Sequence, residues 1–310
     1  MKTILKISLA ITTGFFSLQT FAQQDAMVSQ YMFNGLFLNP AYGGTHSYFT
    51  SSLLYRTQWT GFSGAPKTEL LEIDGPFAKD DKMGLGLIIS HDKIGVTDQT
   101  DYYGTYSYKV KLGKDKLSFG LRAGVSNYKA KLTTLTYWDE DDEVFAENIS
   151  SNLIPKFGYG MYYYGEKYYA GFTIPSLIAY DKGYKFSLDV EKSSYMRRHY
   201  YLNGGYIFPL NESFKLKPSM LMKYVPNAPL QGDISANVMY KEMIWFGVTY
   251  RTKNAVIILA EYQTNFRLRI GYSFDYSTSL LKDYSNGTHE IVIAYDFGRE
   301  ITKTKTPRFF

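Results

Sequence analysis

Residues 266–276 read FRLRIGYSFDY, and apolar and polar side chains alternate along the whole stretch. One face carries an unbroken apolar row: Phe266, Leu268, Ile270, Tyr272, Phe274 and Tyr276. The other face carries Arg267, Arg269, Gly271, Ser273 and Asp275. Successive side chains of a β-strand point to opposite faces, whereas a helix with this spacing would place arginine on its apolar side. The stretch therefore predicts a β-strand with one apolar and one polar face.

The same two-residue alternation returns along the rest of the chain. Its clearest further cases are 102–112, 117–126, 214–224 and 290–297. Including weaker cases, we expect about fourteen strands of roughly 9–11 residues, placed near 47–58, 66–74, 82–91, 99–112, 116–128, 154–164, 167–174, 198–209, 213–224, 231–241, 243–251, 254–263, 265–276 and 288–298. Most connections after even-numbered strands are tight turns, and the longest connections, 129–153 and 175–197, follow odd-numbered strands. The connections near 74–76 and at 252–253 break this rule.

Alternation alone fits both a soluble β-sandwich and a membrane β-barrel, because the apolar face can meet either a core or lipid. The composition favours the barrel: 30 of the 310 residues are Tyr, which suits the boundary between lipid and headgroups. Tight turns that alternate with longer loops are also typical of outer-membrane barrels. We therefore expect an all-β, transmembrane antiparallel up-and-down β-barrel of about 14 strands in the outer membrane of a Gram-negative bacterium. An N-terminal plug-like segment would precede it.

The first 22 residues predict a secretory signal peptide. Lys2 and Lys6 form a positive start, residues 7–21 are mostly apolar, and Thr20-Phe21-Ala22 suits cleavage. A membrane anchor is the alternative, but the apolar run is short and polar residues interrupt it. The expected divisions are a signal peptide at 1–22, a pre-barrel segment at 23–46, the barrel at 47–298 and a C-terminal periplasmic tail at 299–310.

The pre-barrel segment, residues 23–46, is rich in apolar side chains but does not alternate. Asn39-Pro40 favours an extended or turn conformation, and Gly43-Gly44 would end any short helix. The large side chains at 32–38 must be buried somewhere, since each contributes about 1.5–3 kcal/mol on burial. We favour a plug in the barrel lumen. The alternative is a docking arm that becomes ordered only on a partner.

Four blocks of sequence stand out: SQYMFN at 29–34, LNPAYGG at 38–44, RTQWTGFSGAP at 56–66 and SNGTHEI at 285–291. The first three resemble the signature of the PorP/SprF family, and the fourth is similar to that family's last-strand motif. These are outer-membrane proteins of the type IX secretion and gliding machinery of Bacteroidota. The resemblance spans essentially the whole chain after residue 22, and its N-terminal blocks are the specific part.

The resemblance implies a non-enzymatic component of type IX protein secretion or gliding machinery. Such a component binds proteins with a C-terminal sorting domain and helps to secrete them or retain them at the surface. The implied protein partners are a secreted adhesin or enzyme with that domain and, in one branch of the family, periplasmic ring components of the secretion system. The expected barrel also has outer-membrane lipid and lipopolysaccharide as partners. A general porin and a fatty-acid-type channel stay open as alternatives, because Asn39-Pro40-Ala41 ahead of a barrel also looks like the plug of such channels.

Four groups of residues are candidates for the functional site. The plug motif comprises Gln30, Tyr31, Phe33, Asn34, Asn39, Pro40 and Ala41. The first outer loop contributes Trp59, Gly61, Phe62, Gly64 and Pro66, and the last-strand motif contributes Gly287, His289 and Glu290. The expected lumen charges are Arg122, Lys215, Lys217, Arg267 and Arg269. These charges would either pair across strands or form an anion-favouring interior.

We expect no catalytic residue, no metal site and no cofactor. His91-Asp92 and His289-Glu290 are neighbours in sequence, and neighbours in a strand face opposite sides. No two of the four histidines have the short spacing of a metal site, and the absence of Cys removes thiolate ligands. The acidic run at 139–143 lacks the glycine and glutamate of a calcium loop and is expected to be a solvated outer loop. A cation-bridged contact to lipopolysaccharide or to a secreted partner is the alternative. Without Lys2 and Lys6 of the expected signal peptide, the net charge falls from +5 to about +3, which is too weak to imply nucleic-acid binding.

Overall fold

A computed structural model describes residues 27–77, 82–134, 147–150, 153–179, 198–226 and 228–298. The expected signal peptide, the expected periplasmic tail and the acidic run at 139–143 lie outside these residues. One sheet contains the following strands: β1 (Phe49–Thr57), β2 (Lys67–Pro76), β3 (Met83–Ile94), β4 (Thr97–Leu112), β5 (Asp115–Ala130), β6 (Ile149–Ser150), β7 (Ile154–Tyr164), β8 (Tyr168–Ala179), β9 (Tyr200–Tyr206), β10 (Phe208–Pro209), β11 (Phe214–Tyr224), β12 (Gln231–Tyr240), β13 (Ile244–Arg251), β14 (Ala255–Gln263), β15 (Leu268–Ser277) and β16 (Thr288–Phe297).

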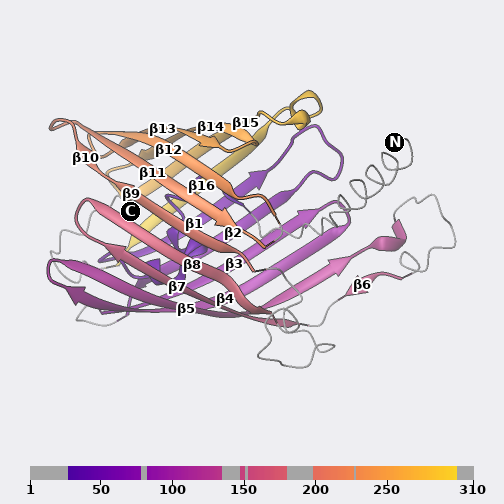
Figure 1. Ribbon diagram of the computed structural model, residues 1–310, viewed down its shortest axis with the longest axis horizontal. Coiled ribbons are helices and arrows are strands. Elements are labelled where there is room, and N and C mark those ends of the chain that lie inside the picture. Colours follow the sequence, from indigo (N-terminus) through magenta and orange to yellow (C-terminus); the bar gives the residue numbers. More distant parts are fainter. Residues whose placement is uncertain are drawn as a thin grey trace, which may run out of the picture.

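The sheet closes on itself to form a barrel (Figure 1). β1 pairs antiparallel with β16, and β9 pairs antiparallel with β11. Each long strand therefore has a paired neighbour on both sides, and the sheet has no free edge among them. β6 and β10 have only two residues each, and they pair with the end of β5 and the start of β11. In the described part of the chain, the other fourteen strands form the wall. The expected antiparallel barrel of about fourteen strands is confirmed.

The wall separates an apolar outer face from a largely polar inner face. In β15, Gly271, Ser273 and Asp275 are buried in the interior, whereas Tyr272 and Tyr276 are exposed on the outside. The neighbouring strands repeat this pattern, because side chains alternate along every strand. The faces expected from the 266–276 stretch are therefore confirmed for β15.

The two ends of the barrel differ in the length of their connections. The end that we call the short-turn end has 77–82, 113–114, 165–167, 210–213, 241–243 and 264–267. The other end, the long-loop end, has 58–66, 95–96, 131–153, 180–199, 225–230, 252–254 and 278–287. The tight turn at 95–96 was not expected, since β3 and β4 extend past their expected bounds of 82–91 and 99–112. The 278–287 loop contains a short 3-10 helix, η4 (Leu280–Asp283), and a second one, η2 (Leu132–Thr134), follows β5.

Aromatic side chains mark both ends of the outer surface. At the short-turn end Phe49 stacks on Phe297, with their ring centroids 5.7 Å apart. At the long-loop end Tyr55, Tyr102 and Tyr250 are exposed on the outside of the wall. Rings at these two levels form the girdles that outer-membrane barrels place at the membrane interfaces.

None of the helices in the described ranges has the length and apolar character needed to cross a membrane.

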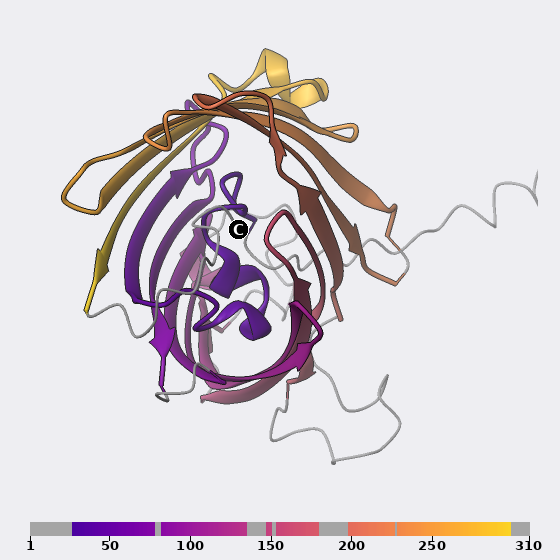
Figure 2. The same cartoon turned by 90° about the vertical axis from the view of Figure 1, so that its left-hand side faces the viewer.

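Residues 27–48, here called the lumen segment, lie inside the barrel (Figure 2). The segment contains one helical turn, α2 (Gly35–Leu38), and a 3-10 turn, η1 (Pro40–Tyr42). Met27 lines a cavity together with Trp59 and Thr288 at the long-loop end. Gly44, in contrast, donates its backbone N–H to Asp74 near the short-turn end of β2. The segment therefore runs down the lumen from the long-loop end to the short-turn end, where it enters β1.

Candidate functional site

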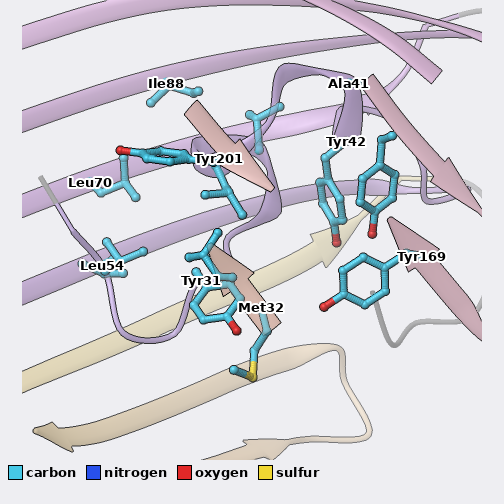
Figure 3. Close-up of a cluster of buried hydrophobic side chains, with 14 of the residues drawn as sticks. Tyr31, Met32, Ala41, Tyr42, Leu54, Leu70, Ile88, Tyr169 and Tyr201 are labelled. Carbon is cyan, nitrogen blue, oxygen red and sulfur yellow. The ribbon is translucent and has the colours of Figure 1, made fainter. Parts of the chain in front are cut away.

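Apolar side chains of the lumen segment pack on an apolar part of the inner wall (Figure 3). Tyr31 and Met32 are almost fully buried in a cluster whose wall members include Leu54, Leu70 and Ile88. Each of these wall residues adjoins an apolar residue that faces outward, so these strands are apolar on both sides. This inner patch gives the segment the apolar surface that a purely polar lumen would lack.

The Asn39-Pro40-Ala41 motif presses directly against the wall. The Asn39 side chain accepts the backbone N–H of Ala41 at 2.9 Å and donates to the backbone carbonyl of Met161 at 2.9 Å. It thus caps η1 and ties that turn to β7. A Cβ on Gly120 of β5 would lie 2.1 Å from the backbone nitrogen of Ala41. The motif can therefore sit here only because the wall has no side chain at that position.

The other end of the segment is held by three charged residues, Arg56, Asp275 and Glu290, which we call the seam clamp. Arg56 of β1 donates to Glu290 of β16 and to Asp275 of β15, at 2.9 Å each. Glu290 also accepts the backbone N–H groups of Ser29 and Gln30, both at 2.8 Å. The Ser29 hydroxyl donates to Asp275 at 2.7 Å and accepts from Arg56. The clamp therefore binds the strands on either side of the β1–β16 seam and the lumen segment in one network.

The remaining plug-motif residues contact β12 and β13 on one side of the lumen and β1 on the other. The Tyr31 hydroxyl lies 3.3 Å from the hydroxyl of Ser235 on β12, and the Phe33 ring meets Trp245 of β13 edge-on at 5.7 Å. Asn34 donates to the backbone carbonyl of Gln30 and accepts from Ser52 of β1. The structure thus brings all seven plug-motif residues into the lumen.

The first outer loop is hydrogen-bonded to residues 286–288, where the chain enters β16. The backbone N–H of Thr60 donates to the carbonyl of Gly287 at 2.8 Å, and the carbonyl of Thr60 accepts the backbone N–H of Asn286 at 2.8 Å. The backbone N–H of Trp59 donates to the Thr288 hydroxyl, and Trp59 has a φ of 47°, which is unusual for a residue with a side chain. Phe62 at the tip is 50% exposed. The loop is thus a fixed structure that presents an aromatic side chain to its surroundings.

Three sequence blocks therefore meet at the long-loop end of the β1–β16 seam. They are the start of the plug motif, the first outer loop, and the last-strand motif. Within the last of these, Glu290 faces the lumen, whereas His289 faces outward and lies 2.7 Å from the Tyr272 hydroxyl. The two neighbours point to opposite sides of the wall, as their places in one strand require.

The expected lumen charges have different positions. Arg122 lies 4.5 Å from the Tyr103 ring and donates to the backbone carbonyls of Phe37 and Pro175, so it links the lumen segment to β8. Lys217 is buried beside the rings of Tyr169 and Trp245. Lys215 pairs with Glu242 in a short turn, and Arg269 pairs with Asp296 at 3.8 Å. Arg267 lies in the turn before β15, with a φ of 68°.

A cavity of about 360 Å³ lies above the seam clamp, at the long-loop end. Its lining includes Met27, Arg56, Trp59, Arg251 and Asp275. Arg251 is itself paired with Asp233 at 3.0 Å and with Asp275 at 3.5 Å. The charges that border the cavity are therefore largely compensated by one another. Among the described residues, no three His, Asp or Glu side chains gather in a way that could hold a metal ion.

A family model described as "Type IX secretion system membrane protein PorP/SprF" matches residues 20–295. The chain belongs to the PorP/SprF family. Its barrel places this PorP/SprF protein in the outer membrane. A search of curated proteins finds no match.

Solved structures similar to this PorP/SprF barrel include several porins. The KdgM porin is 11% identical with a TM-score of 0.39, over 80% of this chain and 99% of that one. A triple mutant of the Rhodopseudomonas blastica porin is 10% identical with a TM-score of 0.35, over 80% and 99%. Omp33 of Acinetobacter baumannii is 7% identical with a TM-score of 0.44, over 82% and 100%. Because these identities and TM-scores are low, the barrel fold of this chain is argued from its own strand pairing and not from the porins.

Sequence reasoning missed Arg56, Arg251 and Asp233 as members of the site. Arg56 lies within the 56–66 block, and Asp233 and Arg251 stand at polar positions of alternating strands. A charged residue at a polar position of an alternating strand predicts a charge that faces the lumen, so this signal was available in the sequence. Their pairing was not predictable, because it depends on which strands are neighbours and in which register. In this PorP/SprF protein, Arg56 is the residue that joins the three blocks.

Proposed function

We propose that this protein is a non-enzymatic docking component of the type IX secretion machinery. It would bind secreted adhesins or enzymes through their C-terminal sorting domain and help to secrete them or retain them at the surface. The observation that carries the proposal is the first outer loop. Backbone hydrogen bonds hold it to Asn286 and Gly287, just before the last strand, and it exposes Phe62 at the long-loop end. A preformed surface with an aromatic anchor suits binding of another protein, because little order has to be gained on association.

The filled lumen favours docking over transport of small molecules. The lumen segment contacts β1, β12, β13 and β16 through the contacts described above, and its Asn39-Pro40-Ala41 motif presses on β5 and β7. A general porin needs an open aqueous path, and a fatty-acid channel needs a continuous apolar one. The 360 Å³ cavity lies on the long-loop side of the segment. On this proposal, the purified barrel conducts ions poorly and carries no apolar cargo.

The short turns would then face the periplasm and the long loops the outside, according to the rule for outer-membrane barrels. This orientation puts the docking loop where a secreted protein arrives. It also leaves the short-turn end to the periplasmic ring components of the secretion system. Contact with the ring is the second partner class that we propose.

A binding measurement with a purified C-terminal sorting domain tests the proposal. The intact barrel in mild detergent should bind the domain, and Phe62→Glu should weaken the affinity at least tenfold, because it puts a charge at the aromatic anchor. Leu210→Glu is the matched control, since Leu210 is 59% exposed but lies at the short-turn end. Planar-bilayer recordings of the same preparation should show no open channel.

Two results would overturn the proposal. Stable channel conductance without any binding of the sorting domain would favour a porin. Co-purified long-chain fatty acids, again without binding of the domain, would favour a fatty-acid channel.

A further inference from the structure

The outer wall carries a second feature, a groove of about 370 Å³ across β16, β1, β2 and β3. Strand register arranges its residues in rows that run across the four strands. The first row is purely apolar and consists of Ile293, Leu53, Leu71 and Ile89, each directly opposite the next. This row faces lipid and lies in the middle of the strands. The groove therefore has an apolar floor within the membrane.

Two residues further toward the long-loop end, the second row contains Ile291, Tyr55, Glu69 and His91. His91 lies 2.9 Å from the Thr100 hydroxyl and 3.6 Å from the Asp98 carboxylate on β4. Tyr55 belongs to the aromatic girdle, and aromatic girdles lie at the level of the lipid headgroups. The second row is thus the boundary between acyl chains and headgroups.

The third row contains His289, Thr57, Lys67 and Lys93. Lys67 and Lys93 are directly opposite each other, and both are exposed. Like charges in this position destabilise a sheet. Neither lysine forms an ion pair with a described residue, although Asp98 is opposite Lys93 on the next strand. An anion between the two ammonium groups would turn this repulsion into attraction.

We infer that the groove binds one molecule of lipid A, the phosphorylated lipid of lipopolysaccharide. One acyl chain lies on the apolar row, the polar linkage of that chain lies beside Tyr55 and Glu69, and a phosphate sits between Lys67 and Lys93. The order along the membrane normal is the order of the lipid itself: hydrocarbon, linkage, phosphate. From Lys67 to Leu71 the strand extends about 13 Å, which at a tilt of about 35–45° is roughly 10 Å along the membrane normal, so the lysines lie toward the edge of a hydrocarbon core of ~30 Å. Basic clusters at the membrane surface are the sites that recognise anionic lipid headgroups.

Native mass spectrometry of the full-length barrel, released from detergent after incubation with lipid A, tests the inference. The wild type should retain one lipid A molecule, and retention of dephosphorylated lipid A should be at least tenfold lower. The double variant Lys67→Gln with Lys93→Gln should lose lipid A to the same extent. Its control is Lys111→Gln with Lys116→Gln, a like-charge pair that is also directly opposite across two strands, but on the lumen-facing side and at the short-turn end. The control should retain lipid A as the wild type does.

A second variant tests the acyl part without changing charge. Leu71→Trp fills the groove and should also reduce retention, whereas Ile258→Trp, on the lipid-facing side of β14, should not. Equal retention by the Lys67/Lys93 variant and its control overturns the phosphate site. Equal retention by Leu71→Trp and Ile258→Trp overturns the groove. No secreted protein is present in this assay, so its result is independent of the docking function.

Discussion

Replacing Glu290 with Gln should release the lumen segment while the barrel wall stays closed. The buried carboxylate accepts the backbone N–H groups of Ser29 and Gln30 at 2.8 Å each and pairs with Arg56 at 2.9 Å. A carboxamide has one acceptor oxygen, so it can keep only one of the two backbone bonds and leaves Arg56 undercompensated. A hydrogen bond to a charged group contributes about 1.5–3 kcal/mol. Loss of one member of a buried ion pair costs about 3–5 kcal/mol.

These two figures describe overlapping contacts, so we expect about 3–5 kcal/mol in total rather than their sum. At 1.36 kcal/mol per factor of ten, the opening equilibrium of the segment should rise about 10²–10⁴-fold. Hydrogen exchange followed by mass spectrometry measures this directly in peptides that cover residues 28–38. The amides there should exchange faster by that factor, and single-channel recordings should show intermittent conductance.

Asp233→Asn is the matched control. It also removes one member of a buried ion pair, since Asp233 binds Arg251 at 3.0 Å, but the Asp233 carboxylate accepts its hydrogen bonds from Arg251 of the wall rather than from the lumen segment. This variant should lower the stability of the wall without speeding exchange at 28–38. Equal acceleration in both variants, or no acceleration in Glu290→Gln, would refute the reasoning that the carboxylate holds the segment.

Gly120→Ala should dislodge the Asn39-Pro40-Ala41 motif and lower the free energy of unfolding in urea by about 1–3 kcal/mol. Gly104→Ala, whose Cβ would meet nothing closer than 4.0 Å, should leave it unchanged. Equal losses in the two variants would contradict the close approach of the motif to Gly120. Ile270→Arg should cost about 2–4 kcal/mol in protein refolded into vesicles, and a cost no larger than that of Ile270→Ala would mean that this side chain does not face lipid. Epitope tags between β5 and β7 and between β8 and β9 should be reachable on intact cells, and a tag at 241–243 only after permeabilisation. The reverse labelling would invert the orientation.

The wall was predictable from sequence because each strand meets lipid on one side and the lumen on the other. Where both faces meet water, this signal disappears. His91, Asp92 and Lys93 are polar in succession, and the alternation therefore predicts a loop at the place where β3 continues to Ile94. The hairpin at 95–96 was missed for this reason. Arg267 was predicted to lie in the wall because the alternation extends beyond the strand: it begins at Phe266, whereas β15 begins at Leu268.

The contents of the lumen left a weaker trace in the sequence. Leu53-Leu54, Leu70-Leu71 and Ile88-Ile89 are apolar pairs inside strands, and each has one side chain toward lipid and one toward the lumen segment. A polar lumen would not produce such pairs, so they were a usable sign of an apolar plug contact. The seam clamp left no comparable trace. Its pairing needs the closure of β1 on β16, which local patterns do not encode.

The seam clamp also sets the order in which the molecule can be completed. Ser29 donates to Glu290 across 261 positions of the chain, and Asp275 and Glu290 belong to the last two strands. The first residues of the described chain therefore find their carboxylate acceptors only when the final hairpin has been inserted. Until then Arg56 has neither of its counterions in place. β16 thus both closes the barrel and supplies the carboxylate that holds the lumen segment. A chain truncated before β16 would have an open wall and a lumen segment without its acceptor.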